Sequence, residues 1–402
     1  MAVKVGYKNY QAYSYLEEGK DYRAFKMAPE VGRVLEYLIP LSPEEEKRAE
    51  KIAQETICIS LHDHAMTIPN DLSGELFEYL REGREKMAYE GLAHSYLDCV
   101  FDNLMSGLST ITSKGGWKWD DILFELGMRL CDIAHQDFII RCEKVEDIYR
   151  AHREGRIAFA PVIEGAAPIE NELDRIDVLY GLGMRMMGIT FSESNGLGSG
   201  LKEKGDSGLT AFGEKAVERM NKVGMAIDCS HTGIKTTLDV IEKSSKPIFM
   251  THVGAKALWN SKRLAPDEVL TACAQKGGVI GIEAAPHTTL TKKHKEHSIY
   301  SYMEHFEYIK NLVGIDHVAF GPDTLYGDHV GLHHVSAARL SIKVSHQAGE
   351  SFEEVPYVKG MENPTEVSKN MVRWLVKQNY SDEEIEKVLS GNILRVLKEV
   401  WK

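Results

Sequence analysis

The chain has 402 residues, of which 43% are hydrophobic and 27% are charged, as is usual for a globular protein. The formal net charge is −12 and the pI is about 5.8, which argues against nucleic acid as a partner because phosphate binding needs a basic face. No stretch approaches 18 uninterrupted apolar residues, which excludes a transmembrane helix, and six scattered cysteines without a CxxC pair predict a soluble, cytoplasmic protein with reduced thiols.

The first 55 residues are mixed in character and lack the apolar core of a signal peptide. Their last part, SPEEEKRAEKIAQET, predicts a helix because Ser42 and Glu45 have the spacing of a capping box. We expect residues 1–55 to form an N-terminal extension packed on the main domain, which spans residues 56–402.

From residue 56 onward, short apolar runs alternate with longer helical patterns, which is typical of βα units and a parallel sheet. Most of these runs are apolar throughout, as expected for strands covered on both faces. The second run is the least regular. The predicted strands cover residues 57–62, 92–100, 157–164, 184–191, 224–231, 246–252, 277–284 and 317–323.

Eight strands with intervening helices favour a single (β/α)₈ TIM barrel. An open, doubly wound sheet is the alternative, because periodicity alone does not decide closure. The stretch 101–156 is longer than one crossover needs and is expected to hold extra helices. Residues 326–361 are polar, contain several histidines and are expected to form a long loop, and the remaining residues are expected to form C-terminal helices.

Metal-binding residue types recur where the predicted strands end. In a parallel barrel all these ends converge on the face where barrel enzymes build their active sites. A single histidine at a strand end is more often structural than a ligand, but recurrence at the same end of five strands favours a metal site. The set exceeds what one tetrahedral ion needs and suits two divalent ions that share a carboxylate. The candidate ligands are His62, His64, Glu164, His231, His252 and Asp323.

The segment His62-Asp63-His64 has the clearest metal-binding pattern. Positions i and i+2 of a strand point to the same side, so both imidazoles can reach one ion, whereas Asp63 should point away. The chain has no GxSxG motif, so the sequence gives no support to serine hydrolase chemistry.

Other histidines are weaker candidates. His333 and His334 lie in the expected loop after the last strand and could reach the site as part of a lid. His294, His297 and His305 lie on a charged, helix-like stretch, where we expect them to be solvated.

The motifs HxH, VIEG, DCSH, MTH and FGPD follow one another along the chain in this order. Together with LYGLGMRMMGIT, SKRLAPDEV and SGNILRV, they make residues 55–400 resemble the membrane (renal) dipeptidase family of the amidohydrolase superfamily. The resemblance implies a binuclear zinc hydrolase that cleaves the amide bond of a dipeptide or a similar small substrate with a metal-bridging hydroxide.

The resemblance also implies a division of the ligands, with one carboxylate bridging the two ions. Glu164 would be the bridge, His62, His64 and Asp323 would hold the first ion, and His231 and His252 would hold the second.

Two residues would act on the substrate. Arg263 would pair with a substrate carboxylate, a task that suits its planar guanidinium. Asp323 would take a proton from the bridging water and pass it to the leaving amine.

The chain departs from the family pattern at two positions. His64 stands where the family has a carboxylate, and Phe191 stands where the family has a histidine thought to polarise the scissile carbonyl. Losing one such donor typically costs about 10²–10³ in rate. Either Ser192, Asn195 or the His333-His334 pair takes its place, or the substrate is not a dipeptide.

The departures leave two alternatives to dipeptide hydrolysis. One is a related enzyme that acts on a non-peptide amide, an ester or an aromatic acid. The other is an inactive barrel used as a binding protein, which predicts substoichiometric metal. A homodimer is compatible with the sequence, which shows no interface.

Overall fold

The computed structural model describes residues 3–104, 118–339 and 351–402. In these three stretches nine short strands form one sheet, and every pair of neighbouring strands in it is parallel. The strands are β1 (Ile59–Asp63), β2 (Cys99–Asn103), β3 (Ile139–Arg141), β4 (Ile157–Ile163), β5 (Met186–Gly188), β6 (Ala226–Asp228), β7 (Phe249–Val253), β8 (Val279–Ile282) and β9 (Val318–Phe320).

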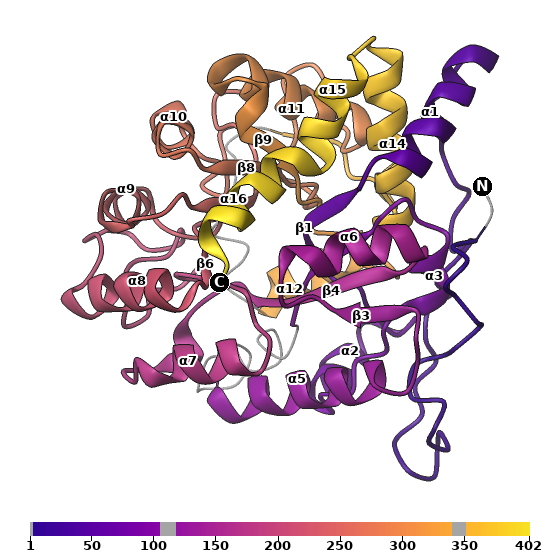
Figure 1. The fold of residues 1–402 in the computed structure, drawn as a ribbon, viewed down its shortest axis with the longest axis horizontal. Coiled ribbons are helices and arrows are strands. Elements are labelled where there is room, and N and C mark those ends of the chain that lie inside the picture. Colours follow the sequence, from indigo (N-terminus) through magenta and orange to yellow (C-terminus); the bar gives the residue numbers. More distant parts are fainter. Residues whose placement is uncertain (1–2, 105–117, 340–350) are drawn as a thin grey trace.

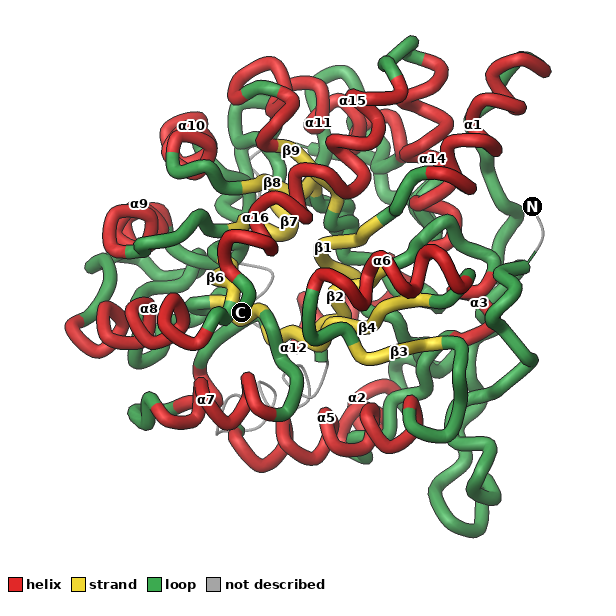
Figure 2. The backbone as a smooth tube through the Cα atoms, viewed as in Figure 1, coloured by secondary structure: helices red, strands yellow, loops and turns green. Residues whose placement is uncertain are grey.

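The strand order β1-β2-β4-β5-β6-β7-β8-β9 describes a barrel of eight strands. The first and last strands meet just beyond β9, where the Asp323 amide donates to the His62 carbonyl over 2.9 Å and the His64 amide donates to the Thr324 carbonyl over 2.8 Å. Figure 2 shows the strands around a common centre with helices outside. The predicted (β/α)₈ barrel is confirmed, and the open sheet is not.

Two details of the strand prediction are wrong. Of the predicted second strand, 92–100, only Cys99 and Val100 lie in a strand, because a short helix ends at Ala93 and β2 runs from Cys99 to Asn103. The sequence analysis also missed β3, which pairs with the first residues of β4 outside the main strand order. With three residues and a final arginine, β3 lacks the apolar run by which strands are recognised.

Helices surround the barrel (Figure 1). Those before β5 are α1 (Pro43–Glu55), α2 (Leu76–Arg81), α3 (Tyr89–Ala93), α5 (Trp119–Ile133), α6 (Val145–Glu154), the 3₁₀ turn η1 (Ala167–Ile169) and α7 (Asp174–Gly181). Those between β5 and β9 are α8 (Ala211–Val223), α9 (Ile234–Lys243), α10 (Asp267–Gln275), α11 (Ile299–Val313) and the 3₁₀ turn η2 (Ile315–His317). After β9 come α12 (His329–Arg339), α14 (Pro364–Lys377), α15 (Asp382–Glu386), the π-helical turn η3 (Lys387–Gly391) and α16 (Asn392–Val400).

Most helix predictions are confirmed. Helix α1 has the predicted capping box between Ser42 and Glu45, α5 and α6 occupy the long stretch before β4, and the C-terminal helices are present. The prediction of a loop over 326–361 is wrong for α12, which begins at His329 soon after β9. Residues 340–350 of that stretch lie outside the described part.

The two ends of the barrel are closed differently. Helix α16 crosses the amino-terminal ends of the strands (Figure 1), where the Asn392 amide donates to the Val318 carbonyl over 2.8 Å and the Trp401 indole donates to the Arg185 carbonyl over 3.2 Å. Leu397 and Trp401 pack there with barrel residues such as Phe101 in one buried apolar cluster. This leaves the carboxyl-terminal end for polar side chains.

The N-terminal residues run over the outside of the barrel. The Lys4 ammonium lies 2.9 Å from Asp98, the Tyr13 amide donates to Asp132 over 2.7 Å, and the Ile39 amide donates to Asn370 over 2.9 Å. The division into an extension (1–55) and a barrel domain (56–402) stays a prediction. Within the described residues no helix has both the length and the apolar character needed to cross a membrane.

Candidate metal centre

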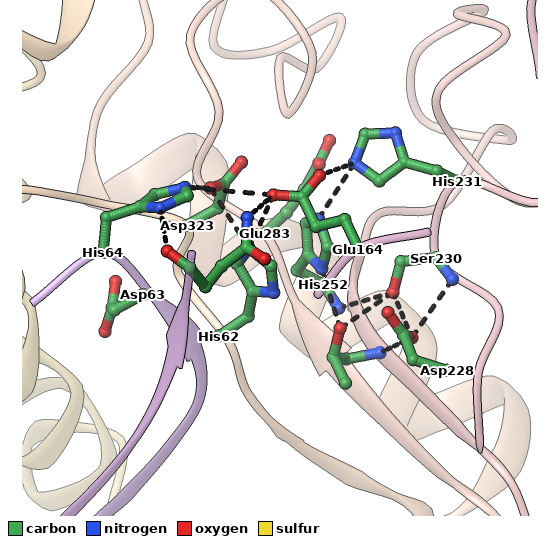
Figure 3. Close-up of polar contacts among 12 residues, drawn as sticks. His62, Asp63, His64, Glu164, Asp228, Ser230, His231, His252, Glu283 and Asp323 are labelled. Atoms are coloured by element: carbon green, nitrogen blue, oxygen red, sulfur yellow. Dashed lines mark hydrogen bonds and ion pairs between the residues drawn. The ribbon is translucent and has the colours of Figure 1, made fainter. Parts of the chain in front are cut away.

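The six predicted ligand residues come together at the carboxyl-terminal end of the barrel (Figure 3). They form two groups, and within each group one ligand atom per residue lies within 4.8 Å of all the others. One group contains His62, His64, Glu164 and Asp323, and the other contains Glu164, His231 and His252. We call the two groups together the buried centre.

The first group surrounds two carboxylate oxygens. His62 Nε2 lies 3.3 Å from Glu164 Oε1 and 3.5 Å from Asp323 Oδ1. His64 Nε2 lies 3.1 Å from the same Asp323 oxygen and 4.0 Å from the Glu164 oxygen. Both imidazoles of the HxH segment therefore face the same pair of carboxylates, as the strand geometry predicts.

The second group lies on the other side of Glu164. Its Oε2 is 3.1 Å from His231 Nε2, which is in turn 3.1 Å from His252 Nε2. The His252 ring stacks on the His62 ring at a centroid distance of 3.6 Å, so the two groups are adjacent. Glu164 presents one oxygen to each group, which is the arrangement that a bridging carboxylate requires.

The backbone places Asp323 by adopting a conformation that non-glycine residues rarely use. Its φ is +61°, in the left-handed region, which costs on the order of 1 kcal/mol. The same turn lets the Asp323 amide donate to the His62 carbonyl and directs the carboxylate at His62 and His64. The strained residue thus closes the barrel and completes the first group.

Hydrogen bonds at the far nitrogens fix the orientation of three imidazoles. His64 Nδ1 lies 3.1 Å from the Asn103 carbonyl, His252 Nδ1 lies 2.8 Å from the Thr251 hydroxyl, and His231 Nδ1 lies 3.4 Å from the Ser192 hydroxyl. A carbonyl only accepts, so Nδ1 of His64 carries a proton, which directs Nε2 to the Asp323 carboxylate and would leave Nε2 as the metal-binding nitrogen. Such partners orient metal-binding histidines and set their tautomer.

The histidines and the carboxylates of the buried centre shift one another's pKa. Burial opposes charge, but hydrogen bonds to Asp323 and Glu164 outweigh it and raise the pKa of His62 to about 10. Burial also opposes ionisation of Glu164 and Asp323, yet the neighbouring histidines hold the pKa of each carboxyl well below its usual range. Burial and nearby positive charge lower the pKa of His231 and His252.

These pKa shifts are a test of whether the residues fit metal ions. Two buried carboxylates need positive charge, and imidazole nitrogens with free lone pairs stand beside them. Divalent ions would supply that charge in place of the proton on His62, and the mixed nitrogen and oxygen donors suit zinc. The donor set fits.

Asp63 and Asp228 hold the scaffold around the ligands. Asp63 points away from the centre, as predicted, and accepts from the Thr324 amide and hydroxyl, each over 2.8 Å. Asp228 accepts from the Ser230 hydroxyl over 2.6 Å and from the Thr251 amide over 2.8 Å (Figure 3). The first set of bonds ties β1 to the segment after β9, and the second ties β6 to β7.

The sequence analysis missed two side chains of this region. The Asn103 amide, at the end of β2, donates to Glu164, and the Glu283 carboxylate follows β8 and lies beside the ligands (Figure 3). Both are polar residues at the end of an apolar run, which is the signal that found the ligands. They escaped because the predicted second strand stopped at residue 100 and the predicted strand over 277–284 included Glu283.

Arg263 is buried and already paired. Its guanidinium lies 2.7 Å from the Glu283 carboxylate and donates to the carbonyls of His252 and Ser230 over 2.7 and 3.1 Å. Only 1% of the Arg263 surface is exposed. Burial raises the pKa of Glu283 to about 7, although the Arg263 charge opposes this shift. A substrate carboxylate would therefore meet a guanidinium that has a carboxylate partner.

Ser192 and Asn195, two of the candidates to replace the histidine missing at Phe191, lie in different surroundings. The Phe191 ring stacks on His231 at a centroid distance of 4.4 Å, and the Ser192 hydroxyl faces the same imidazole. Asn195 donates to the Ile189 carbonyl and accepts from the Leu197 amide, each over 2.8 Å, and these two bonds shape the loop. Of the two, Ser192 is the one beside a candidate ligand.

The candidates His333 and His334 on α12 face opposite ways. His333 is buried, and its Nε2 lies 3.1 Å from Nε2 of His329. His334 is exposed and contacts Glu354 at 3.2 Å. The structure therefore separates the pair: His333 faces inward, and His334 faces outward.

The expectation that His297 and His305 are solvated is wrong. Both are buried. His297 Nε2 lies 3.0 Å from the Thr289 hydroxyl, and His305 accepts from the Ala255 amide over 2.9 Å and lies 2.8 Å from the Leu290 carbonyl. These bonds hold the loop between β8 and α11. His294 is half-buried.

Comparison with known proteins supplies a family. The model of the family described as "Membrane dipeptidase (Peptidase family M19)" matches residues 124–355 and 347–402. This match includes Glu164, His231, His252 and Asp323 but begins after the HxH segment.

Individual relatives agree with the family match. The chain is 27% identical to dipeptidase aclJ of Aspergillus oryzae over 339 residues, which are 82% of this chain and 71% of that protein. It is 27% identical to dipeptidase tcpJ of Claviceps purpurea over 66% of this chain, a region that spans little more than half (56%) of that relative. Among solved structures, an amidohydrolase from Pseudomonas aeruginosa superposes with a TM-score of 0.68 at 25% identity, covering 88% of this chain and 99% of that one.

Proposed function

The chain belongs to the membrane dipeptidase family, peptidase family M19, and on that premise we propose that it is a binuclear zinc hydrolase that cleaves the amide bond of a dipeptide or a similar small substrate. The observation that carries the proposal is the position of Glu164, whose two oxygens face two separate histidine groups. The two buried carboxylates, each beside imidazole nitrogens, support it as well.

The ligands would divide as the geometry groups them. His62, His64 and Asp323 would hold one ion, His231 and His252 the other, and Glu164 would bridge them. Bound divalent ions lower the pKa of a water molecule and polarise a substrate carbonyl. Asn103, Thr251 and Ser192 keep three imidazoles oriented for this task.

Asp323 is the proposed proton carrier. Its side chain is 15% exposed, against 8% for Glu164, so it is the more accessible of the two carboxylates. Its fixed backbone aims the carboxylate at the ligand atoms. In the proposed reaction it accepts a proton from the attacking water and delivers it to the leaving amine.

Arg263 remains the proposed partner of a substrate carboxylate, with a condition set by its ion pair. Because Glu283 already neutralises the guanidinium, an incoming carboxylate must compete with that side chain. Substrates that lack a free carboxylate do not face this competition. The ion pair is one reason to include them among the candidate substrates.

A second candidate function rests on Phe191. Its ring covers one face of His231, where the family pattern expects a polar histidine. An aromatic side chain there suits a substrate with an apolar or aromatic group. The alternative is therefore hydrolysis of a non-peptide amide or ester, or a reaction of an aromatic acid, at the same metal centre.

A substrate panel tests the proposal. Zinc-reconstituted protein should release amino acids from at least some members of a panel of L,L- and L,D-dipeptides, and His231→Ala should abolish that release. No cleavage of any dipeptide by protein with full metal content would refute it, and cleavage of aryl esters or N-acyl amino acids instead would favour the alternative. Substoichiometric metal would indicate an inactive barrel. The cytoplasmic location and a homodimeric state remain predictions.

A further inference from the structure

A third group of metal-binding side chains lies apart from the buried centre. His287, His334 and Glu354 each place one ligand atom within 4.8 Å of the other two. We call these three residues the rim cluster, because His287 follows β8 and His334 follows β9 at the carboxyl-terminal end of the barrel. They come from three segments that are far apart in the sequence.

The two imidazoles of the rim cluster converge on one oxygen. His287 Nε2 lies 2.8 Å and His334 Nε2 lies 3.2 Å from the same Glu354 Oε2. Ligand bonds of about 2.0–2.1 Å around a tetrahedral zinc ion place neighbouring donor atoms about 3.3 Å apart. The two separations are close to that value and the two nitrogens lie within 4.8 Å of each other, so small adjustments of the exposed His334 and Glu354 side chains would accommodate an ion.

His287 is held in place by its surroundings. Its ring stacks with those of His334 and Phe352, at centroid distances of 5.2 and 4.8 Å. Its φ is +68°, a left-handed conformation that is rare for a residue other than glycine and is found at functional sites. The loop that carries it is also held by hydrogen bonds of Thr289 with His297 and of the Leu290 carbonyl with His305.

The segment that carries Glu354 is fastened to the same loop. The Glu353 amide donates to the Lys295 carbonyl over 3.0 Å, and the Ile299 amide donates to the Lys359 carbonyl over 3.0 Å. Two of the three ligands are thus carried by segments already joined through their backbones. The third, His334, comes from α12.

We propose that the rim cluster is a further metal site, which binds one divalent transition-metal ion such as Zn²⁺ through His287 Nε2, His334 Nε2 and Glu354 Oε2. Two imidazoles and one carboxylate are a donor set that zinc accepts, with water in the fourth position. The ion fastens α12 to the loop after β8. His333, the residue before His334 on α12, is buried against His329, so the same helix contacts both the rim ion and the interior.

Counting bound zinc in full-length variants tests the site. Metal-free protein is equilibrated with Zn²⁺, unbound ion is removed, and zinc per chain is measured for wild type, His334→Ala, Glu354→Gln and Glu164→Gln. His94→Ala serves as the control because His94 lies outside all three metal-binding groups. His334 and Glu354 are more than half exposed, so neither substitution threatens folding.

The rim site predicts one fewer zinc ion per chain in His334→Ala and in Glu354→Gln than in wild type and His94→Ala. It also predicts that part of the rise in melting temperature caused by zinc is lost in both variants. Glu164→Gln should keep the rim ion while losing ions from the buried centre, which separates this proposal from the proposed function. Wild-type zinc content and wild-type stabilisation by zinc in both rim variants would overturn it, and would leave a plain His–Glu ion pair.

Discussion

The buried centre and the rim cluster use the same kinds of side chain in very different surroundings. In the buried centre, residues on or just after barrel strands meet where Glu164 and the histidines are at most 8% exposed. In the rim cluster, a loop, a helix and a late segment meet at the surface, where His334 and Glu354 are 53% and 58% exposed. The two sites therefore offer the same donor atoms but differ in how far these are buried.

Burial decides how much an ion matters at each place. Charges in a low-dielectric interior interact strongly, and two buried carboxylates without a counter-charge are costly. At the surface, water and salt screen the same pair. An ion in the buried centre should therefore control both stability and reaction, whereas an ion at the rim should mainly hold α12.

The largest effect is expected for Glu164→Gln, which tests the role of the buried centre. Because Glu164 faces both groups, the variant should lose metal from both, and kcat/KM on any substrate found should fall by about 10³ or more, since ions of this kind contribute several kcal/mol to transition-state stabilisation. Zinc content and kcat/KM measure the effect. A variant with full metal content and activity would remove the bridging role.

Asp323→Asn separates proton transfer from metal binding. Asparagine keeps an oxygen donor but cannot accept the proton, so kcat should fall by about 10²–10⁴, while the ion held by His231 and His252 is retained. Metal content, kcat and KM should be measured together. A loss confined to KM would contradict the proton-carrier role.

Asn103→Ala tests how far the buried centre depends on residues that do not bind metal. The Asn103 side-chain amide donates to Glu164, and alanine removes this bond but keeps the backbone carbonyl that contacts His64. Losing such a partner typically costs about 10–100-fold in metal affinity or activity. Competition with a zinc chelator gives the affinity. Unchanged affinity and activity would show that the strands alone hold the ligands in place.

Glu30→Gln gives the smallest expected effect and shows what burial does to a carboxyl that lacks basic partners. Burial raises the pKa of Glu30 to about 7, and its side chain accepts from the Gly91 amide over 2.9 Å. The folded state thus holds this proton more tightly than the unfolded state, so wild-type stability is lost as pH rises from about 4.5 to 7.

Glutamine keeps the acceptor and removes the titration. The variant should match wild type below about pH 5 and exceed it at about pH 8, as measured by denaturant unfolding across that range. Equal stabilities at both pH values would show that Glu30 does not titrate in this way. Glu30 would then no longer serve as the example of a buried carboxyl with a raised pKa, against which the lowered pKa values of Glu164 and Asp323 are compared.

The six candidate ligands were predictable from sequence because barrel topology converts strand ends into neighbours. Asn103 and Glu283 obey the same rule and were missed only through the placement of strand ends. The rim cluster has no such rule: His334 lies on a helix predicted as loop, and His287 and Glu354 meet through loops. Their meeting depends on tertiary packing.

The periodicity of the sequence also did not predict whether the sheet closes into a barrel. Closure rests on backbone bonds at His62 and His64 and on the bonds from Thr324 to Asp63, none of which has a signature in the sequence. His305 was misread because charged neighbours conceal a buried face of α11, on which Tyr302 and Phe306 are buried as well. His297 lies just before this helix and is buried by the loop that it bonds.

The most direct test of the central claim is anomalous diffraction at the zinc edge from crystals of zinc-loaded protein. The account predicts two strong peaks on opposite sides of the Glu164 carboxylate, one beside His62, His64 and Asp323 and one beside His231 and His252. A single peak, or none at this position in zinc-saturated protein, would contradict it.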